Sequence, residues 1–132
     1  MRRTAIMLFA VMAITLLSCG EKAPATEKVV ATTAKLYYDY LLEEKYDDFV
    51  GGIDLSFPKS EKYSEQMRDC AKMFVARQKE IHQGIKAVGA VNAEVDDDAH
   101  SANAFLVLHY SDSTSEQVVV PMVERKGVWL MR

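Results

Sequence analysis

The chain has 132 residues, of which 49% are hydrophobic and 27% are charged, and its formal net charge is −3. This length leaves room for one domain, and the composition is typical of a globular protein rather than a disordered one. The acidic balance and the absence of a Lys/Arg cluster argue against a nucleic-acid-binding protein.

The first 18 residues have the organisation of an export signal. Arg2 and Arg3 precede an apolar run from Ala5 to Leu17, which is shorter than the roughly 20 residues that a transmembrane helix needs. The motif Leu16-Leu17-Ser18-Cys19 resembles a bacterial lipobox. The resemblance implies cleavage before Cys19 and attachment of a diacylglycerol to its sulfur. A transmembrane anchor and an ordinary secretory leader are the alternatives.

A lipid on Cys19 makes the membrane a partner of this protein, because two or three acyl chains anchor a protein stably. We therefore expect a cell-envelope protein at the outer membrane, the periplasmic face or the cell surface. Residues 19–26 form a short polar segment with a proline, which predicts a tether after the 1–18 signal peptide. The chain from Cys19 onward has 14 basic and 19 acidic residues, a net charge of −5.

Residues 27–50 have apolar side chains at steps of three and four, which predicts an amphipathic helix. Gly51 and Gly52 end this helix or a short continuation of it. The apolar positions are Val29, Val30, Leu36, Tyr37, Tyr40, Leu41 and Phe49.

A second helix is predicted from Ser60, which can cap its first turn, to Gly84, which can end it. Its apolar stripe is Tyr63, Met67, Cys70, Phe74, Gln78 and Ile81. If Cys19 carries lipid, Cys70 has no partner for a disulfide within the chain. We therefore expect Cys70 to be buried in this stripe and reduced.

The periodicity then changes to two, which is typical of strands. The predicted strands are 85–95, 103–110, 117–125 and 128–131, separated by polar turns at 96–101 and 111–115 and by Lys126-Gly127. Gly89 indicates a bulge or bend in the first strand. Pro121 favours an edge or a bulge in the third strand.

Two helices followed by four antiparallel strands predict an α+β fold, with the helices packed on a curved sheet over residues 27–132. This order resembles the cone-shaped nuclear-transport-factor-2-like (NTF2-like) superfamily, and in particular its small bacterial lipoproteins of unknown function. The resemblance rests on the Tyr-rich segment 36–42 and on Gly127-Val128-Trp129. It implies a space between helices and sheet, which either is filled as core or forms an apolar pocket. The residues expected there are Tyr37, Tyr40, Phe74, Met122 and Trp129.

The candidate catalytic and metal-binding residues form no recognisable motif. His82 lies near a helix end and His100 in a turn, while His109 is expected at the margin of the core beside Phe105 and Val107. No histidine pair has metal-ligand spacing, and Asp96-Asp97-Asp98 lacks the alternation of a calcium loop. No cofactor or metal is therefore expected.

An isomerase or dehydratase of the NTF2-like type would need an ionisable group inside the pocket. His109, Glu124 and Asp39 are the plausible candidates, although the helix periodicity turns Asp39 outward. We therefore expect a non-catalytic domain that binds a small hydrophobic ligand or a partner protein. A small enzyme that uses the cone pocket is the alternative.

Overall fold

The computed structural model describes residues 22–54 and 61–132, with side chains described from residue 26 onward in the first helix. Three helices come first along the chain: α1 (Lys22–Leu42), α2 (Tyr46–Gly51) and α3 (Glu61–His82). Four strands follow: β1 (Ile85–Asp96), β2 (Ser101–Tyr110), β3 (Ser115–Arg125) and β4 (Val128–Met131).

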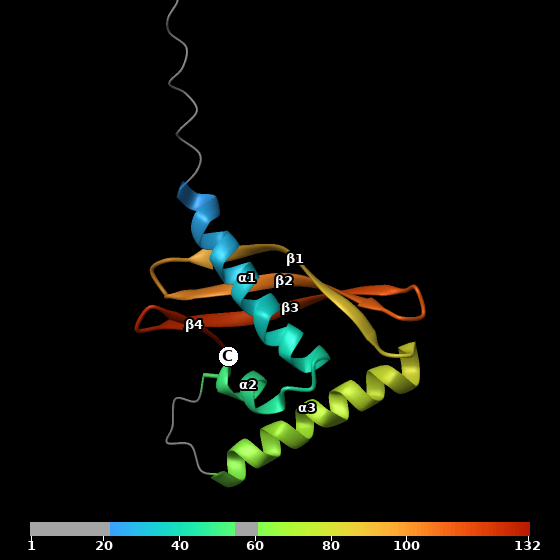
Figure 1. The fold of residues 1–132 in the computed structure, drawn as a ribbon. Coiled ribbons are helices and arrows are strands. Elements are labelled where there is room, and N and C mark those ends of the chain that lie inside the picture. Colours follow the sequence, from blue (N-terminus) through green and yellow to red (C-terminus); the bar gives the residue numbers. More distant parts are fainter. Residues whose placement is uncertain (1–21, 55–60) are drawn as a thin grey trace, which may run out of the picture.

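The four strands form one antiparallel sheet in the order β1-β2-β3-β4, joined by short turns (Figure 1). Two register shifts interrupt the β1–β2 pairing, one between Ile85 and Ala87 and one between Ala90 and Asn92. Beyond β4, Ile53 forms a parallel bridge with Met131, which ties the end of α2 to the sheet. The predicted strands are confirmed with ends shifted by at most two residues.

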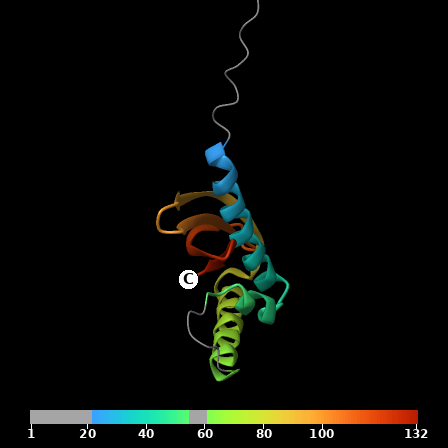
Figure 2. The same cartoon turned by 90° about the vertical axis from the view of Figure 1, so that its left-hand side faces the viewer.

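Helix α1 crosses one face of this sheet and covers it (Figures 1 and 2). We call the contact between them the helix–sheet interface. Small residues on α1, Ala31 and Ala34, are 4% and 0% exposed there and let the helix approach the strands closely. The α+β fold class, with helices on a curved antiparallel sheet, is thus confirmed. The sheet side of the interface is formed by Val88, Ala93, Ala104, Leu106, Leu108, Tyr110, Val120, Met122, Trp129 and Met131.

The predicted first helix is divided in two. Glu44 has a φ of 58°, which no α-helix can accommodate, so the helix is interrupted between α1 and α2. The short continuation expected before Gly51 is therefore a separate helix. Gly52 follows it, and a Cβ there would lie 2.4 Å from the ring of Tyr37, so only glycine fits. Helix α1 also starts at Lys22, inside the range expected for the tether, because Pro24 is tolerated in a first helical turn. Residues 1–21, with the predicted signal peptide and Cys19, lie outside the described residues.

Helix α3 has the predicted length, but a different face of it is buried. Its buried residues are Ala71 and Val75, whereas Cys70 is exposed, so the prediction that Cys70 is buried was wrong. The packed side of α3 is centred on Ala71 and Val75, which contact Leu41 of α1, so Met67, Phe74 and Gln78 of the stripe are half-buried while Tyr63, Cys70 and Ile81 are exposed. Gly84 ends the helix at a φ of 106°, as predicted, while Ser60 lies outside the described residues.

Candidate functional site

Three of the residues expected between helices and sheet do lie in the helix–sheet interface. Met122 is 0% and Trp129 is 8% exposed. Tyr37 packs against the same cluster, and its hydroxyl donates a 2.8 Å hydrogen bond to the carbonyl of Trp129. Burial raises the pKa of this phenol, with a smaller contribution from Tyr40. Tyr37 therefore ties α1 directly to β4.

The other two expected residues differ from each other in their packing. Phe74 is half-buried, where α3 meets the main core and a small second cluster formed by Leu41, Ala71 and Val75. Tyr40 is half-buried on α1 and belongs to neither cluster. The structure thus brings Tyr37, Phe74, Met122 and Trp129 to one core, whereas Tyr40 packs against neither cluster.

The space between α1 and the sheet is filled by side chains. Val30, Ala34, Ala104, Leu106 and Met122 are all 0% exposed, so none of them borders a void that could hold a water molecule. Such close packing is usual for a protein core.

None of the three candidate acid–base residues points into this space. His109 lies on the outer face of the sheet, where its Nδ1 is 3.1 Å from the Ser115 hydroxyl. Glu124 contacts His100 at 3.2 Å, and Asp39 pairs with Lys35 at 2.7 Å on α1. His109 shares a face with Phe105 and Val107 as predicted, but it is exposed rather than at the core margin. Apart from Tyr110 and Trp129, whose aromatic rings are part of the core, no side chain with a polar or charged group is buried among the described residues.

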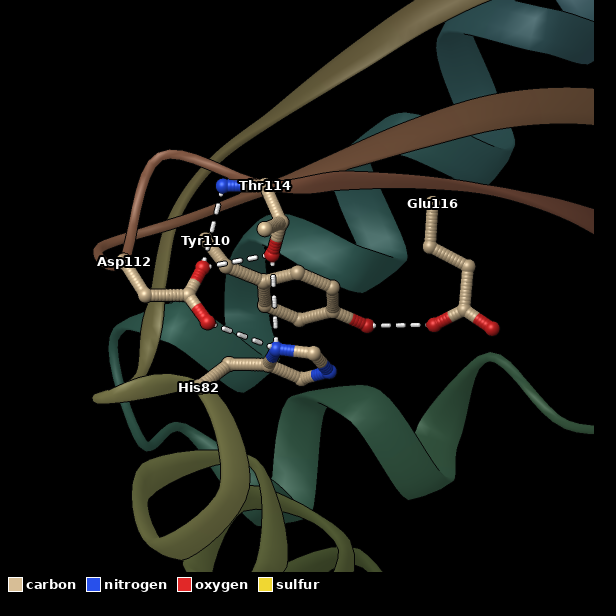
Figure 3. A network of polar contacts seen from close by, with 5 residues as sticks. All are labelled: His82, Tyr110, Asp112, Thr114 and Glu116. Atoms are coloured by element: carbon tan, nitrogen blue, oxygen red, sulfur yellow. Dashed lines mark hydrogen bonds and ion pairs between the residues drawn. The ribbon is translucent and has the colours of Figure 1, made fainter.

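The most extensive polar contacts join the end of α3 to the β2–β3 turn (Figure 3). We call this cluster the polar network, and it comprises His82, Tyr110, Asp112, Thr114 and Glu116. The imidazole of His82 stacks on the Tyr110 ring, with centroids 3.9 Å apart and planes 10° from parallel. Its Nδ1 lies 2.9 Å from Asp112 Oδ2, and the Tyr110 hydroxyl donates a 2.6 Å bond to Glu116.

The backbone brings these residues together. Gly84 and Gln83, with φ values of 106° and 67°, reverse the chain after α3. The amide of Asp112 then donates to the His82 carbonyl at 3.2 Å, and the amide of Ser111 donates to the Gly84 carbonyl at 2.8 Å. His82 also lies in the last turn of α3, where a protonated imidazole favours the helix dipole.

The network shifts the acidity of two of its members. The Thr114 hydroxyl, His82 and the Thr114 amide, in that order, lower the pKa of Asp112 from 3.8 to about 2. Burial, and then the Glu116 carboxylate, raise the pKa of Tyr110 to about 12. Asp112 is therefore a carboxylate at neutral pH that can only accept hydrogen bonds, and the Nδ1 of His82 donates to it.

This arrangement resembles the acid–histidine half of a catalytic triad but lacks the other half. In a triad, the nucleophile contacts the ring nitrogen that the acid does not use. Here Thr114 Oγ1 and Asp112 Oδ2 approach the same atom, Nδ1, at 3.4 Å and 2.9 Å. The neighbouring hollow of about 380 Å³ is lined by Gln83, Gly84 and Ser111 among others, but not by His82 or Asp112. The geometry therefore fits a clamp between α3 and the sheet.

Sequence reasoning missed the polar network because its halves are 30 residues apart. The sequence places His82 only near a helix end, and it places Asp112 only within the polar turn 111–115. Asp112-Ser113-Thr114 does form such a turn, with the Thr114 amide 3.0 Å from Asp112 Oδ1. One signal was available in the sequence. If a helix ends at Gly84 and β1 pairs with β2 in antiparallel fashion, the end of that helix must lie near the end of β2 and the turn that follows it.

The apolar stripe of α3 borders an open hollow of about 620 Å³. We call this surface the outer face of α3. Met73 is 70% and Ile81 is 54% exposed there. Exposed apolar surface of this kind is a common feature of protein interaction sites. The lining residues are Cys70, Met73, Phe74, Ala76, Arg77, Glu80 and Ile81.

Within residues 22–54 and 61–132, no group of three or more His, Cys, Asp or Glu side chains is placed to hold a metal ion. None of the helices in these segments is long and apolar enough to cross a membrane.

The helix order, the four-stranded curved meander and the covering helix α1 define an NTF2-like cone fold. A crystal structure from Campylobacter jejuni, described as a candidate NTF2-like transpeptidase, superposes with a TM-score of 0.60 at 19% sequence identity. The match covers 74% of this chain and 92% of the other chain. No family model matches the sequence, and no curated protein matches it either.

Proposed function

We propose that this chain is a lipid-anchored protein of the bacterial cell envelope, whose folded domain acts by binding another protein rather than by catalysis. The observation that carries the second part is the filled helix–sheet interface. An NTF2-like enzyme or carrier of small apolar molecules needs an open pocket there, whereas Leu106 and Met122 are 0% exposed. The exposed apolar outer face of α3 favours a protein partner over an enclosed ligand.

The lipid anchor is supported by the sequence. Leu16-Leu17-Ser18-Cys19 resembles a lipobox after a charged and then apolar leader. Acyl chains on Cys19 would hold the protein at a membrane without a spanning helix. The proposed location is the outer membrane, the periplasmic face or the cell surface.

The name given to the Campylobacter protein raises the question of acyl transfer. That chemistry needs a nucleophile within hydrogen-bond reach of a base. Cys70, on α3, lies 12 residues before His82, a rise of about 18 Å along one helix. Thr114 shares Nδ1 with Asp112, so it cannot pass a proton to the opposite ring nitrogen. These distances favour the non-catalytic reading.

Replacement of the lipobox cysteine tests the anchor. Cells expressing the wild-type chain should incorporate labelled fatty acid and retain the protein in the membrane fraction. Cys19→Ala should abolish both, because the thioether has no sulfur to form on. Cys70→Ser is the matched control and should label like the wild type. Equal labelling of Cys19→Ala and wild type would contradict the lipoprotein assignment.

The filled interface is tested with small apolar probes. Trp129 is the single tryptophan of the chain and lies inside the interface. Titration with fatty acids or steroids should leave its emission unchanged, because there is no space beside it for a guest. Saturable quenching or a spectral shift would show an accessible pocket and would favour the ligand-binding or enzymatic alternative.

A further inference from the structure

Helix α1 exposes apolar and basic side chains on the side that faces away from the sheet. The residues are Lys28, Val29, Thr32, Lys35 and Leu36, which lie on one face of the helix because of their spacing. We call this surface the basic face of α1. Val29 is 52% and Leu36 is 47% exposed, whereas Val30 and Ala34 on the opposite side are 0% exposed.

The charges on this surface differ in sign from those of the chain as a whole. Residues 28–36 contain two lysines and no acidic residue, although the chain from Cys19 onward has a net charge of −5. Lys35 pairs with Asp39 at 2.7 Å, while Lys28 has no ion-pair partner among the described residues. Half-buried Glu27 lies on the sheet-facing side, one turn before Val30 and Ala31. Asp39 shares the face of Lys35 but comes, like Glu43 and Glu44, only after Leu36. The exposed charge therefore changes from basic to acidic along α1.

The segment between Cys19 and α1 is short. Cys19 lies three residues before Lys22, the first residue of the helix, so at most about 10 Å of chain separates the two. Lys28 is six residues into α1, about 9 Å along its axis. An acyl group on Cys19 would therefore hold the basic face within reach of the lipid headgroups.

We infer that the basic face of α1 docks on the anionic surface of the bilayer that holds the lipid anchor. This inference rests on the proposed lipid anchor and specifies how the anchored domain is oriented. Val29 and Leu36 enter the boundary between headgroups and acyl chains, and Lys28 contacts anionic headgroups. Such a pairing of apolar and basic side chains on one helix face is typical of interfacial helices.

The rest of the fold is compatible with this orientation. No described helix or strand lies over the first half of α1 in either view (Figures 1 and 2). The acidic end of α1 stays off the anionic surface, so the helix lies tilted. Helix α3 sits at the far end of α1 from the anchor, so its outer face remains accessible to a protein.

The acylated protein, purified from membranes and reconstituted, provides the test. In a Cys70→Ser background, Thr32→Cys carries a polarity-sensitive fluorophore on the basic face, and Gln117→Cys carries it on the outer face of the sheet as a control. Vesicles contain nitroxide-labelled lipid, with either phosphatidylglycerol or only phosphatidylcholine. We expect quenching at position 32 in the anionic vesicles and little at position 117. The quenching at position 32 should weaken in 1 M salt, where screening acts over about 3 Å.

Charge reversal separates docking from anchoring. Lys28→Glu with Lys35→Glu should lower the ratio of docked to undocked protein by about tenfold or more, since each basic residue near an anionic surface contributes to binding. The matched control, Lys62→Glu with Lys79→Glu on α3, should leave that ratio unchanged. Labelled fatty acid in the same samples reports the anchor independently.

Three results would overturn the inference. Acylated protein whose position 32 is equally unquenched in both kinds of vesicle would remove the docking and leave the anchor intact. Shielding of position 32 in detergent that grows with protein concentration would assign the face to a protein contact. Absence of the fatty-acid label would remove the anchor and the docking together.

Discussion

The helix–sheet interface and helix α3 are held in very different ways. Helix α1 is packed into a continuous core with the four strands, in which several side chains have no exposed surface. Helix α3 has 22 residues, yet only Ala71 and Val75 are buried. They meet Leu41 in the small second cluster, and the polar network fixes the last turn of α3.

The difference shows that helix length and amphipathicity do not decide how firmly a helix is attached. Local stability follows buried apolar contacts, and elements with few of them open at lower free energy. We therefore expect the sheet and α1 to unfold together, while α3 detaches first.

Trp129→Ala should cost about 3–5 kcal/mol of unfolding free energy, because it leaves a cavity in the helix–sheet interface. Val128→Ala is the matched control, since Val128 is 52% exposed on the same strand, and it should change stability by less than about 0.5 kcal/mol. Chemical denaturation followed by circular dichroism measures both. A Trp129→Ala midpoint close to that of the wild type would mean that β4 does not close the core.

Val75→Ala should cost about 1–2 kcal/mol, because it removes part of the small cluster under α3. Met73→Ala, on the same helix at a position 70% exposed, should be nearly neutral. Partial proteolysis should show cleavage within α3 rising in Val75→Ala while the sheet remains resistant. Uniform destabilisation of sheet and helix would show that α3 belongs to the main cooperative unit.

Asp112 gives the polar network a specific pH dependence. Its pKa is lowered in the folded state to about 2, so its contribution to stability is present above the ordinary carboxyl range and is lost as the pH falls from about 4 to about 2. Asp112→Asn should remove that part of the acid transition, whereas Asp97→Asn should retain it. Thermal unfolding across this pH range checks the prediction, and identical acid limbs for wild type and Asp112→Asn would refute it.

Cys70→Ser should have the smallest effect, a change below about 0.5 kcal/mol, because the thiol is exposed. A water-soluble maleimide should modify Cys70 quickly in the native protein. If Cys70 reacts only after denaturant is added, Cys70 is buried, and the face of α3 that we describe as its outer face is the packed one.

The sequence was sufficient to predict the elements that follow directly from periodicity. The change to a period of two after Gly84 predicted four strands, and their ends lie within two residues of the predicted ones. Gly84 likewise predicted the end of α3, where a positive φ is required. These features depend on the local conformation of the chain.

The features that were mispredicted depend on how separate elements meet. The stripe of Cys70, Phe74 and Ile81 is regular in the sequence. No sequence pattern, however, specifies that α3 packs beside α1 and α2 instead of lying across the face of the sheet. The His82–Asp112 pair depends on the same docking angle. The break at Glu44 was hidden because the residues on both sides of it have helical periodicity.

Native-state hydrogen exchange tests the contrast between the two regions most directly. The amides of β2 and of the middle of α1 should exchange only through global unfolding, while those of α3 from Met67 to Gln78 should exchange through a local opening of clearly lower free energy. Equal protection of α3 and β2, with the same dependence on denaturant, would contradict the account.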